Sequence, residues 1–247
     1  MSHEDATLDL KFLMALIKEE KELRSIACIP DVRLCVYRHA TRGTIYVDGS
    51  RGRLCPRPDP GFNMVESIRA GVVVTVQSPV MAVISGLKPR LWAPPSIHTA
   101  IETCRAKRKR FCVLNLGIHD AADWNLGHSN ALIVDLKYDN LEVFDPQGRA
   151  LYEPTVRRLM EREFPQFKYV GGGPRVGIQS RADAFEGLCS TYTSMFVVLR
   201  LKNPHLTKRQ VESLMVKGSP ETVRTRALRF NAFMADKLRR HRKNSLL

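Results

Sequence analysis

A cysteine nucleophile needs three kinds of neighbour, and the second half of the sequence offers a candidate for each. An imidazole must take the thiol proton, a carboxylate or amide must orient the imidazole, and hydrogen-bond donors must stabilise the oxyanion. The candidates are His128 as the base, Asp145 as its orienting partner, Gln179 as an oxyanion donor and Cys189 as the nucleophile. These residue types predict covalent catalysis on an acyl group.

Cys189 begins a segment that is apolar at helical spacing as far as Leu199, and Gly187 breaks the chain just before it. We therefore expect Cys189 in the first turn of a buried helix. The positive end of a helix dipole favours the thiolate, which is the nucleophilic form of cysteine. The alternative is a structural cysteine, because free cysteines are often simply buried.

His128 and Asp145 lie on either side of a predicted β-hairpin. Strand-like runs over 131–136 and 141–144 are separated by a turn that contains Asp139-Asn140. The second strand of a hairpin returns toward the start of the first, so we expect His128 and Asp145 at one edge of the sheet, although they are not direct cross-strand partners. A proline follows Asp145 and ends the strand; the alternative for this residue is an ordinary turn aspartate.

Gln179 lies ten residues before Cys189. From there its amide N–H could reach the oxyanion, together with the backbone N–H of Cys189. Taken alone, it would be an ordinary surface glutamine. Trp124 lies in the loop before His128, where it would pack against the histidine loop, contact substrate or simply belong to the core.

The surrounding elements predict an α+β fold. We expect helices over 6–24, 96–107, 153–164, 189–203, 207–216 and 221–240, with Thr207 capping the fifth of these. We expect strands over 32–37, 44–47, 72–76, 80–84, 110–116, 131–136, 141–144 and 167–170. The composition changes at Pro94-Pro95, so we divide the chain into an N-terminal α+β region (1–93), to which the sequence assigns no role, and a C-terminal domain (94–247).

The charge of the chain predicts an anionic partner. The formal net charge is +14, from 39 Lys and Arg against 25 Asp and Glu, which suits nucleic acid, an acidic substrate or a capsid interior. The candidate nucleic-acid contacts form one cluster: Arg105, Lys107, Arg108, Lys109 and Arg110. A second cluster lies near the C-terminus. The alternative is a solvated face, because neither cluster has interleaved aromatic residues.

The remaining patterns argue against several other classes of protein. Six cysteines are scattered without a Cys-x-x-Cys pair, and the N-terminus has no secretory leader, so we expect an intracellular, reducing compartment. The spacing of the cysteines and histidines matches no common zinc module, and we expect neither metal nor cofactor. The low-charge run over 70–87 is interrupted by polar residues and a proline, so we expect two buried strands there and no membrane span.

The order His128, Asp145, Gln179, Cys189, with 17 residues from the first to the second, resembles the adenain-like clan of cysteine proteases. This clan includes the adenovirus maturation proteases, the SUMO and ubiquitin-like protein proteases, and the thiol proteases of large DNA viruses. The resemblance is strongest to the viral members, and five motifs carry it. They are an Arg-Phe strand, a His-x-Asn-x-Leu-Ile-x-Asp strand, a Phe-Asp-Pro-x-Gly turn, a Gly-x-Cys helix start and a Leu-Arg-Leu-x-Asn-Pro helix end. These motifs occupy 110–111, 128–135, 144–148, 187–189 and 199–204. The chain departs from the cellular members in having Ser129 after the histidine, where they have tryptophan.

The resemblance covers residues 94–217 and implies an adenain-like fold, a central and mostly antiparallel sheet flanked by helices. It implies that His128 is the base, Asp145 its orienting partner, Cys189 the nucleophile and Gln179 the oxyanion residue. It further implies a viral protease that processes structural or core protein precursors in the host cell and virion, with a nucleic-acid or peptide activator. The alternatives are an isopeptidase for ubiquitin-like conjugates, an acetyl-CoA-dependent acyltransferase, and a non-catalytic basic virion or nucleic-acid-binding protein.

Overall fold

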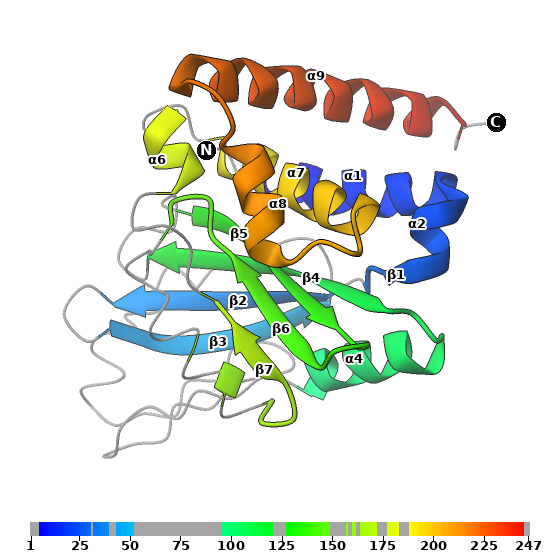
Figure 1. The fold of residues 1–247 in the computed structure, drawn as a ribbon. Helices are drawn as coiled ribbons and strands as arrows, with labels where there is room; N and C mark the ends of the chain where they lie inside the picture. Colours follow the sequence, from blue (N-terminus) through cyan, green and yellow to red (C-terminus); the bar gives the residue numbers. More distant parts are fainter. Residues whose placement is uncertain are drawn as a thin grey trace, which may run out of the picture.

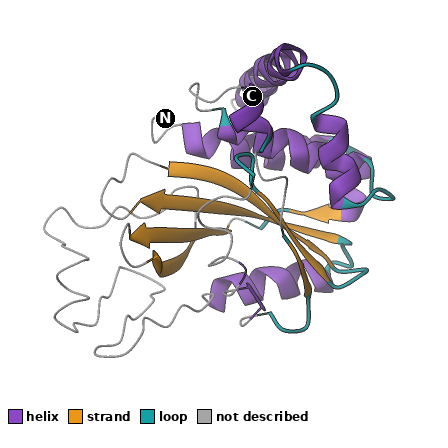
Figure 2. Ribbon diagram, turned by 60° about the vertical axis from the view of Figure 1, so that its left-hand side comes forward, coloured by secondary structure: helices purple, strands orange, loops and turns teal. Residues whose placement is uncertain are grey.

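The strands that the structure describes form one mixed sheet with helices on both of its faces (Figures 1 and 2). The structure is a computed structural model. It describes residues 5–30, 32–39, 43–51, 95–120, 127–148, 157, 160–161, 164–171, 177–182 and 188–244. The predicted strands at 72–76 and 80–84 and the side chain of Trp124 lie outside the described residues. None of the helices within these ranges has the length and apolar character that a membrane span requires.

Within the described residues the sheet has seven strands. Six of them follow the order β3-β2-β4-β5-β6-β7, and the seventh, β1, pairs with β4. The strands are β1 Ala27–Cys28, β2 Val32–His39, β3 Gly43–Arg51, β4 Phe111–Asp120, β5 Gly127–Asp135, β6 Asn140–Phe144 and β7 Lys168–Val170. The two longest registers, β4–β5 and β2–β3, are antiparallel, whereas β1–β4, β2–β4 and β6–β7 are parallel. The α+β class is therefore confirmed, and the sheet is mixed.

The parallel pairing of β2 with β4 places the N-terminal strands in the same sheet as the site-bearing strands. Parallel neighbours need a long crossover connection, and the chain between β3 and β4 includes α4, which lies on one face of the sheet (Figure 1). The division of the chain at residue 93 stays a prediction.

The described helices are unequally distributed over the two faces. Of these helices, α4 alone covers one face, whereas α1, α7, α8 and α9 gather over the other, with α9 outermost (Figures 1 and 2). The bounds are α1 Asp5–Glu19, α2 Lys21–Ile26, α4 Pro95–Ala106, α6 Ile178–Ala182, α7 Cys189–Lys202, α8 Lys208–Met215 and α9 Pro220–Asn244. The prediction that Thr207 caps the helix that follows it is confirmed, since it forms a capping box with Gln210.

The central helix of the fold is α7, in which twelve of the fourteen residues are buried. It packs on β5 and β6, where Phe196 stacks on Phe144 with ring centroids 4.2 Å apart. A helix buried on all sides needs partners for its charged residues. Arg200 has them, because its guanidinium lies 2.9 Å from both carboxylate oxygens of Glu142 and 3.3 Å from Asp135.

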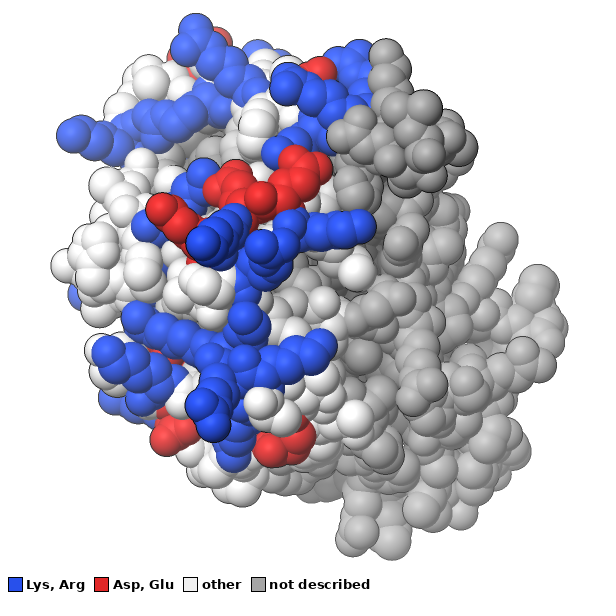
Figure 3. Space-filling model, turned by 90° about the vertical axis from the view of Figure 1, so that its right-hand side faces the viewer, with Lys and Arg blue, Asp and Glu red and all other residues white. Residues whose placement is uncertain are grey.

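Many of the described Lys and Arg side chains lie at one end of the molecule. This is the end where α2, the end of α4 and the C-terminal part of α9 lie (Figures 1 and 3). Within it, α4 ends in a Schellman motif: Arg108 N–H donates to the carbonyl of Arg105, and Lys109 N–H donates to that of Cys104. Arg108 occupies the left-handed position of the motif, with φ 53°, where glycine is usual.

Replacing Arg108 with glycine should therefore stabilise the protein. A side chain at a left-handed φ costs roughly 1 kcal/mol relative to glycine, so we expect the free energy of unfolding to rise by about that amount. Urea denaturation would measure it. Arg108→Ala, which keeps a Cβ at the strained position, should give no comparable gain, and a destabilised glycine variant would contradict the assignment of strain.

Candidate active site

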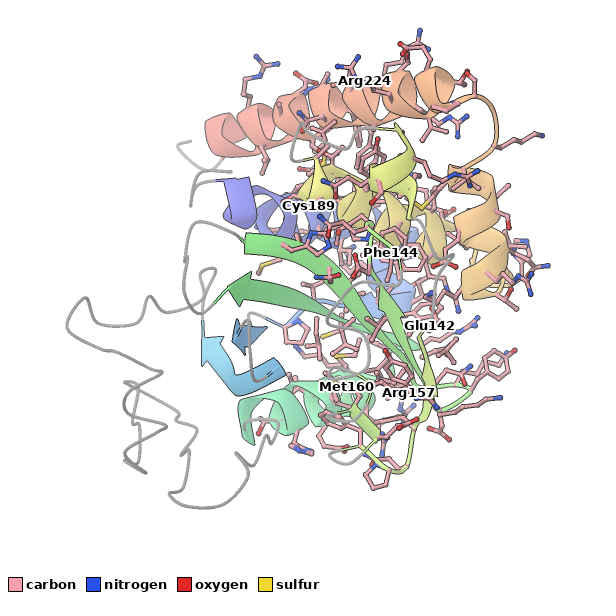
Figure 4. All side chains as sticks on the ribbon, turned by 90° about the vertical axis from the view of Figure 1, so that its left-hand side faces the viewer. Glu142, Phe144, Arg157, Met160, Cys189 and Arg224 are labelled. Atoms are coloured by element: carbon pink, nitrogen blue, oxygen red, sulfur yellow. The ribbon has the colours of Figure 1, made fainter. Side chains whose placement is uncertain are left out.

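The fold brings three of the four predicted residues of the site to one end of the sheet. Cys189 is the first residue of α7 and is 3% exposed. His128 is the second residue of β5, and Asp145 directly follows β6. Figure 4 shows Cys189 between α7 and the sheet. As predicted, the helix that begins at Cys189 is buried and the hairpin of β5 and β6 returns Asp145 toward His128.

The imidazole of His128 is held by the carboxylate of Asp145. Nε2 of His128 lies 2.7 Å from Oδ1 of Asp145, and both side chains are largely buried. The last register pair of the hairpin is Ala131 with Phe144, so the two residues lie just beyond the paired part of the strands. The expectation that they meet without being direct cross-strand partners is confirmed.

Cys189 is the second partner of His128. Because Nε2 of His128 faces Asp145, Nδ1 is the ring nitrogen left for the sulfur. Burial opposes protonation of the imidazole, but the hydrogen bonds to Asp145 and Cys189 and the negative charges of both outweigh it, and the pKa of His128 is raised to about 9. An imidazolium is thereby favoured at neutral pH, beside a cysteine at a helix N-terminus.

The turn that follows Asp145 fixes the orientation of its carboxylate. Gln147 N–H donates to Oδ1 of Asp145 at 2.8 Å, and Gly148 N–H donates to its backbone carbonyl at 3.0 Å. Oδ1 therefore accepts from the backbone as well as facing His128. Because the turn holds the carboxylate in place, the carboxylate can in turn fix the orientation of the His128 ring.

Gln179, the fourth predicted residue, is brought to the same turn. It lies in α6, is 5% exposed, and its backbone N–H donates to the carbonyl of Pro146 at 2.8 Å. Among the described residues its Oε1 has no hydrogen-bond partner. Helix α6 packs against α7, which carries Cys189. Its role as an oxyanion donor stays a prediction.

Gly177 joins the Asp145 turn to the Gln179 helix, and nothing in the sequence pointed to it beyond a glycine near Gln179. Its N–H donates to the carbonyl of Gln147 at 2.8 Å. A Cβ at Gly177 would lie 2.1–2.3 Å from backbone atoms of residues 146–148, closer than any side chain can approach. Only glycine therefore allows the two segments to lie this close.

Replacing Gly177 with alanine should misplace Asp145 and Gln179 together. Displacements of about 1 Å at such a site cost about 10²-fold in rate, and forcing a methyl group between two backbones costs roughly 1–3 kcal/mol in stability. The control is Gly218→Ala, at φ 107° before α9, which should lose stability but keep its specific activity. Equal specific activities of the two variants, measured on folded protein, would contradict a positioning role for Gly177.

Thr193 braces α7 against the histidine strand. Its Oγ1 donates to the backbone carbonyl of Ser129 at 3.0 Å, and both side chains are buried. Thr193 lies one helical turn after Cys189, and Ser129 is adjacent to His128. The hydrogen bond thus helps to set the distance between Cys189 and His128. Thr193 was not predicted from the sequence, because nothing in its residue type indicates this contact.

Three residues of the predicted basic cluster make ion pairs or hydrogen bonds through their side chains, and two do not. Arg105 pairs with Glu102, Arg110 pairs with Asp135, and the Nζ of Lys109 donates to backbone carbonyls at the end of α2. Lys107 and Arg108 are exposed and make no such contact with the described residues. The cluster lies at the end of α4, away from the start of β5, so it forms no part of this site.

Among the described residues, no group of three or more His, Cys, Asp and Glu side chains is arranged to hold a metal ion. Three thiols do lie together, those of Cys28, Cys104 and Cys112. A hydrogen bond with Cys104 raises the pKa of the Cys28 thiol, and one with Cys112 raises the pKa of the Cys104 thiol. The raised pKa values favour the neutral thiol at Cys28 and at Cys104.

No protein-family model and no curated protein matches the chain. Solved structures similar to it include ChlaDub1 of Chlamydia trachomatis, with a TM-score of 0.46 and 14% identity over 96% of this chain and 95% of that one. A second structure, of the Chlamydia trachomatis effector ChlaDUB1, has a TM-score of 0.40 and 16% identity over 63% of this chain. The match covers 65% of that protein, just under two thirds of its length. The structure of the Chlamydia trachomatis effector Cdu1 bound to ubiquitin has a TM-score of 0.38 and 14% identity, over 69% of this chain and 75% of that one.

Proposed function

We propose that this chain is a cysteine peptidase or isopeptidase that hydrolyses an amide bond of a protein substrate. The observation that supports it most strongly is the position of His128, between the carboxylate of Asp145 and the thiol of Cys189. A buried imidazole with these two partners matches the needs of a thiol nucleophile at a helix N-terminus.

In the proposed reaction, the Cys189 sulfur attacks the carbonyl carbon of the scissile bond. The imidazolium of His128 then donates its proton to the leaving amine, which departs and leaves a thioester on Cys189. Water, deprotonated by the now neutral imidazole, attacks the thioester and releases the carboxylic acid. Asp145 holds the ring and stabilises its positive charge throughout.

We propose two donors for the oxyanion of the tetrahedral intermediates: the backbone N–H of Cys189 and the side-chain amide of Gln179. Cys189 is the first residue of α7, and the first N–H groups of a helix point out of its N-terminal end, toward the position that we propose for the oxyanion. Two observations support Gln179 for this role: it is buried, and its backbone N–H donates to the carbonyl of Pro146 in the turn of Asp145. Removing one oxyanion donor typically costs about 10²–10³-fold in kcat.

For the substrate we propose a ubiquitin-like conjugate as the first class to assay, since Cdu1 was solved bound to ubiquitin. Processing of viral structural or core precursors, in a host cell or virion, is the second. The decisive assay offers the purified protein ubiquitin and SUMO probes with an electrophilic C-terminus, a peptide-substrate library, and labelled acetyl-CoA. A probe adduct on Cys189 that is absent from Cys189→Ala supports the isopeptidase, cleavage of peptides alone supports the precursor protease, and acetylated protein would instead indicate acyl transfer.

A further inference from the structure

Two turns from different parts of the chain lie side by side at the end of the sheet opposite the candidate active site. One is the turn after α4 and the other is the hairpin turn between β5 and β6. They are joined by a 2.7 Å hydrogen bond from Leu136 N–H to the carbonyl of Arg110, and Lys168 N–H donates to the carbonyl of Asp139 at 2.7 Å. These bonds bring together the end of α4, the hairpin turn and the start of β7, each of which carries at least one Lys or Arg.

Two of these cations lie beside an exposed aromatic ring, that of Tyr138. Tyr138 is 58% exposed, the largest exposure among the large hydrophobic side chains that the structure describes. The guanidinium of Arg110 lies 5.0 Å from its ring centroid, and the Nζ of Lys137 lies 5.1 Å from it. Arg110 is itself fixed by Asp135 at 2.8 Å, so the ring rests on an ordered support while most of it faces solvent.

Four cations in these turns and at the start of β7 make no ion pair or hydrogen bond with the described residues through their side chains: Lys107, Arg108, Lys137 and Lys168. They are all exposed. Asp135, which pairs with Arg110, is buried; two exposed acidic residues in this region are Asp139, in the hairpin turn, and Glu102, which pairs with Arg105. Figure 3 shows this end of the molecule, with Lys and Arg side chains gathered on its lower part.

Arg108 gives a second, independent reason to regard this end as functional. A left-handed φ of 53° is strained for arginine, and glycine would fit the Schellman motif better. A strained residue kept at a surface turn is an observation from which a function can be inferred. Here the strained residue is an exposed arginine that follows Lys107 and lies two residues before Arg110, which supports the Tyr138 ring.

We propose that this surface, defined by Tyr138, Arg108, Lys107, Lys137 and Lys168, binds single-stranded nucleic acid, with a base stacked on Tyr138 and the cations on flanking phosphates. Stacking platforms of this kind accept any base, because every base has a π-face, and the cations follow the backbone. The basic residues alone indicated only an anionic partner. The exposed ring is what favours a single strand, since bases in a duplex are already stacked on each other.

The surface is separate from the candidate active site. His128 lies near the start of β5 and Tyr138 lies just past its end, so they are roughly 25 Å apart along the strand. A bound oligonucleotide would therefore leave Cys189 accessible. The proposal goes beyond the proposed peptidase activity and does not depend on it.

The test is fluorescence anisotropy of the full chain with a labelled oligothymidylate of about 12 nucleotides and with a duplex of the same length. We expect the single strand to bind more tightly, and its association constant to fall with salt with a log–log slope of about −3, from four phosphate contacts at about −0.7 each. Tyr138→Ala should weaken binding at least about fivefold, whereas Tyr138→Phe, which keeps the ring, should bind like wild type.

Two charge variants separate a specific surface from net charge. Arg108→Gly should weaken binding and reduce the salt slope by about 0.7, although we expect it to be more stable than wild type. Arg229→Gln removes the same charge from the exposed side of α9, on the other face of the sheet, and should bind like wild type. The proposal is overturned by unchanged binding of Tyr138→Ala, by a duplex that binds as tightly as the single strand, or by binding only to vesicles of anionic lipid.

Discussion

Cys189→Ser is expected to abolish hydrolysis, with a loss of at least about 10⁴-fold in kcat. The serine hydroxyl is far less acidic than a thiol, so an imidazole arranged to form a thiolate does not activate it. Cys189 is 3% exposed and its replacement removes no large side chain, so the free energy of unfolding should change little. The measurement is kcat/KM on whichever substrate class the wild type turns over fastest, with urea denaturation of the same preparations.

The control for this prediction is Cys28→Ser. Cys28 is half-buried, belongs to the thiol group with Cys104 and lies on β1, outside the candidate site. It should retain activity. Residual activity of Cys189→Ser within about tenfold of wild type would contradict a thiol mechanism, because knocking out a catalytic nucleophile costs orders of magnitude more.

Asp145→Asn should lower activity by about 10²–10⁴-fold and shift the pH dependence. In the wild type, the pKa of His128 is raised to about 9, so the imidazolium that protonates the leaving amine is lost, and kcat/KM falls, above about that pH. Without the carboxylate, burial of the ring is less strongly opposed and the pKa of His128 decreases. The alkaline limb of the profile should therefore move to lower pH by at least about one unit.

The same shift has a consequence for stability, with a definite sign. Because the folded pKa of His128 lies above its unfolded value of about 6.5, protonation of this ring stabilises the fold fully below about pH 6.5. This contribution is lost as the pH rises through about 9. His205→Asn, at an exposed histidine beyond the end of α7, is the control and should leave the activity profile unchanged. An alkaline limb that stays in place in Asp145→Asn would contradict the coupling of Asp145 to His128.

The sequence was sufficient where local rules determine the structure. The hairpin around Asp139-Asn140, the buried helix from Cys189 and the cap at Thr207 depend on turn chemistry, helical periodicity and a side chain reaching its own backbone. The meeting of His128 with Asp145 followed from the hairpin. The order of the four candidate residues then indicated the chemistry.

The sequence was insufficient where contacts join distant segments. The parallel pairing of β2 with β4 depends on a crossover connection that no local pattern fixes. Gly177 mattered because a second backbone lies where its Cβ would be. Tyr138 was not among the residues singled out from the sequence, because its support by Arg110 depends on two turns that are far apart in sequence.

The central claim is that His128 activates Cys189, and the most direct test is the alkylation rate of each thiol in the reduced protein between about pH 5 and pH 9. Iodoacetamide labelling is mapped by mass spectrometry in wild type and in His128→Ala, with Cys28, Cys104 and Cys112 as internal references. We predict that Cys189 reacts much faster than the three references near neutral pH, where an ordinary thiol with a pKa of about 8.5 is mostly protonated, and that His128→Ala removes this advantage. Equal alkylation rates of Cys189 in the two proteins across this pH range would contradict the claim.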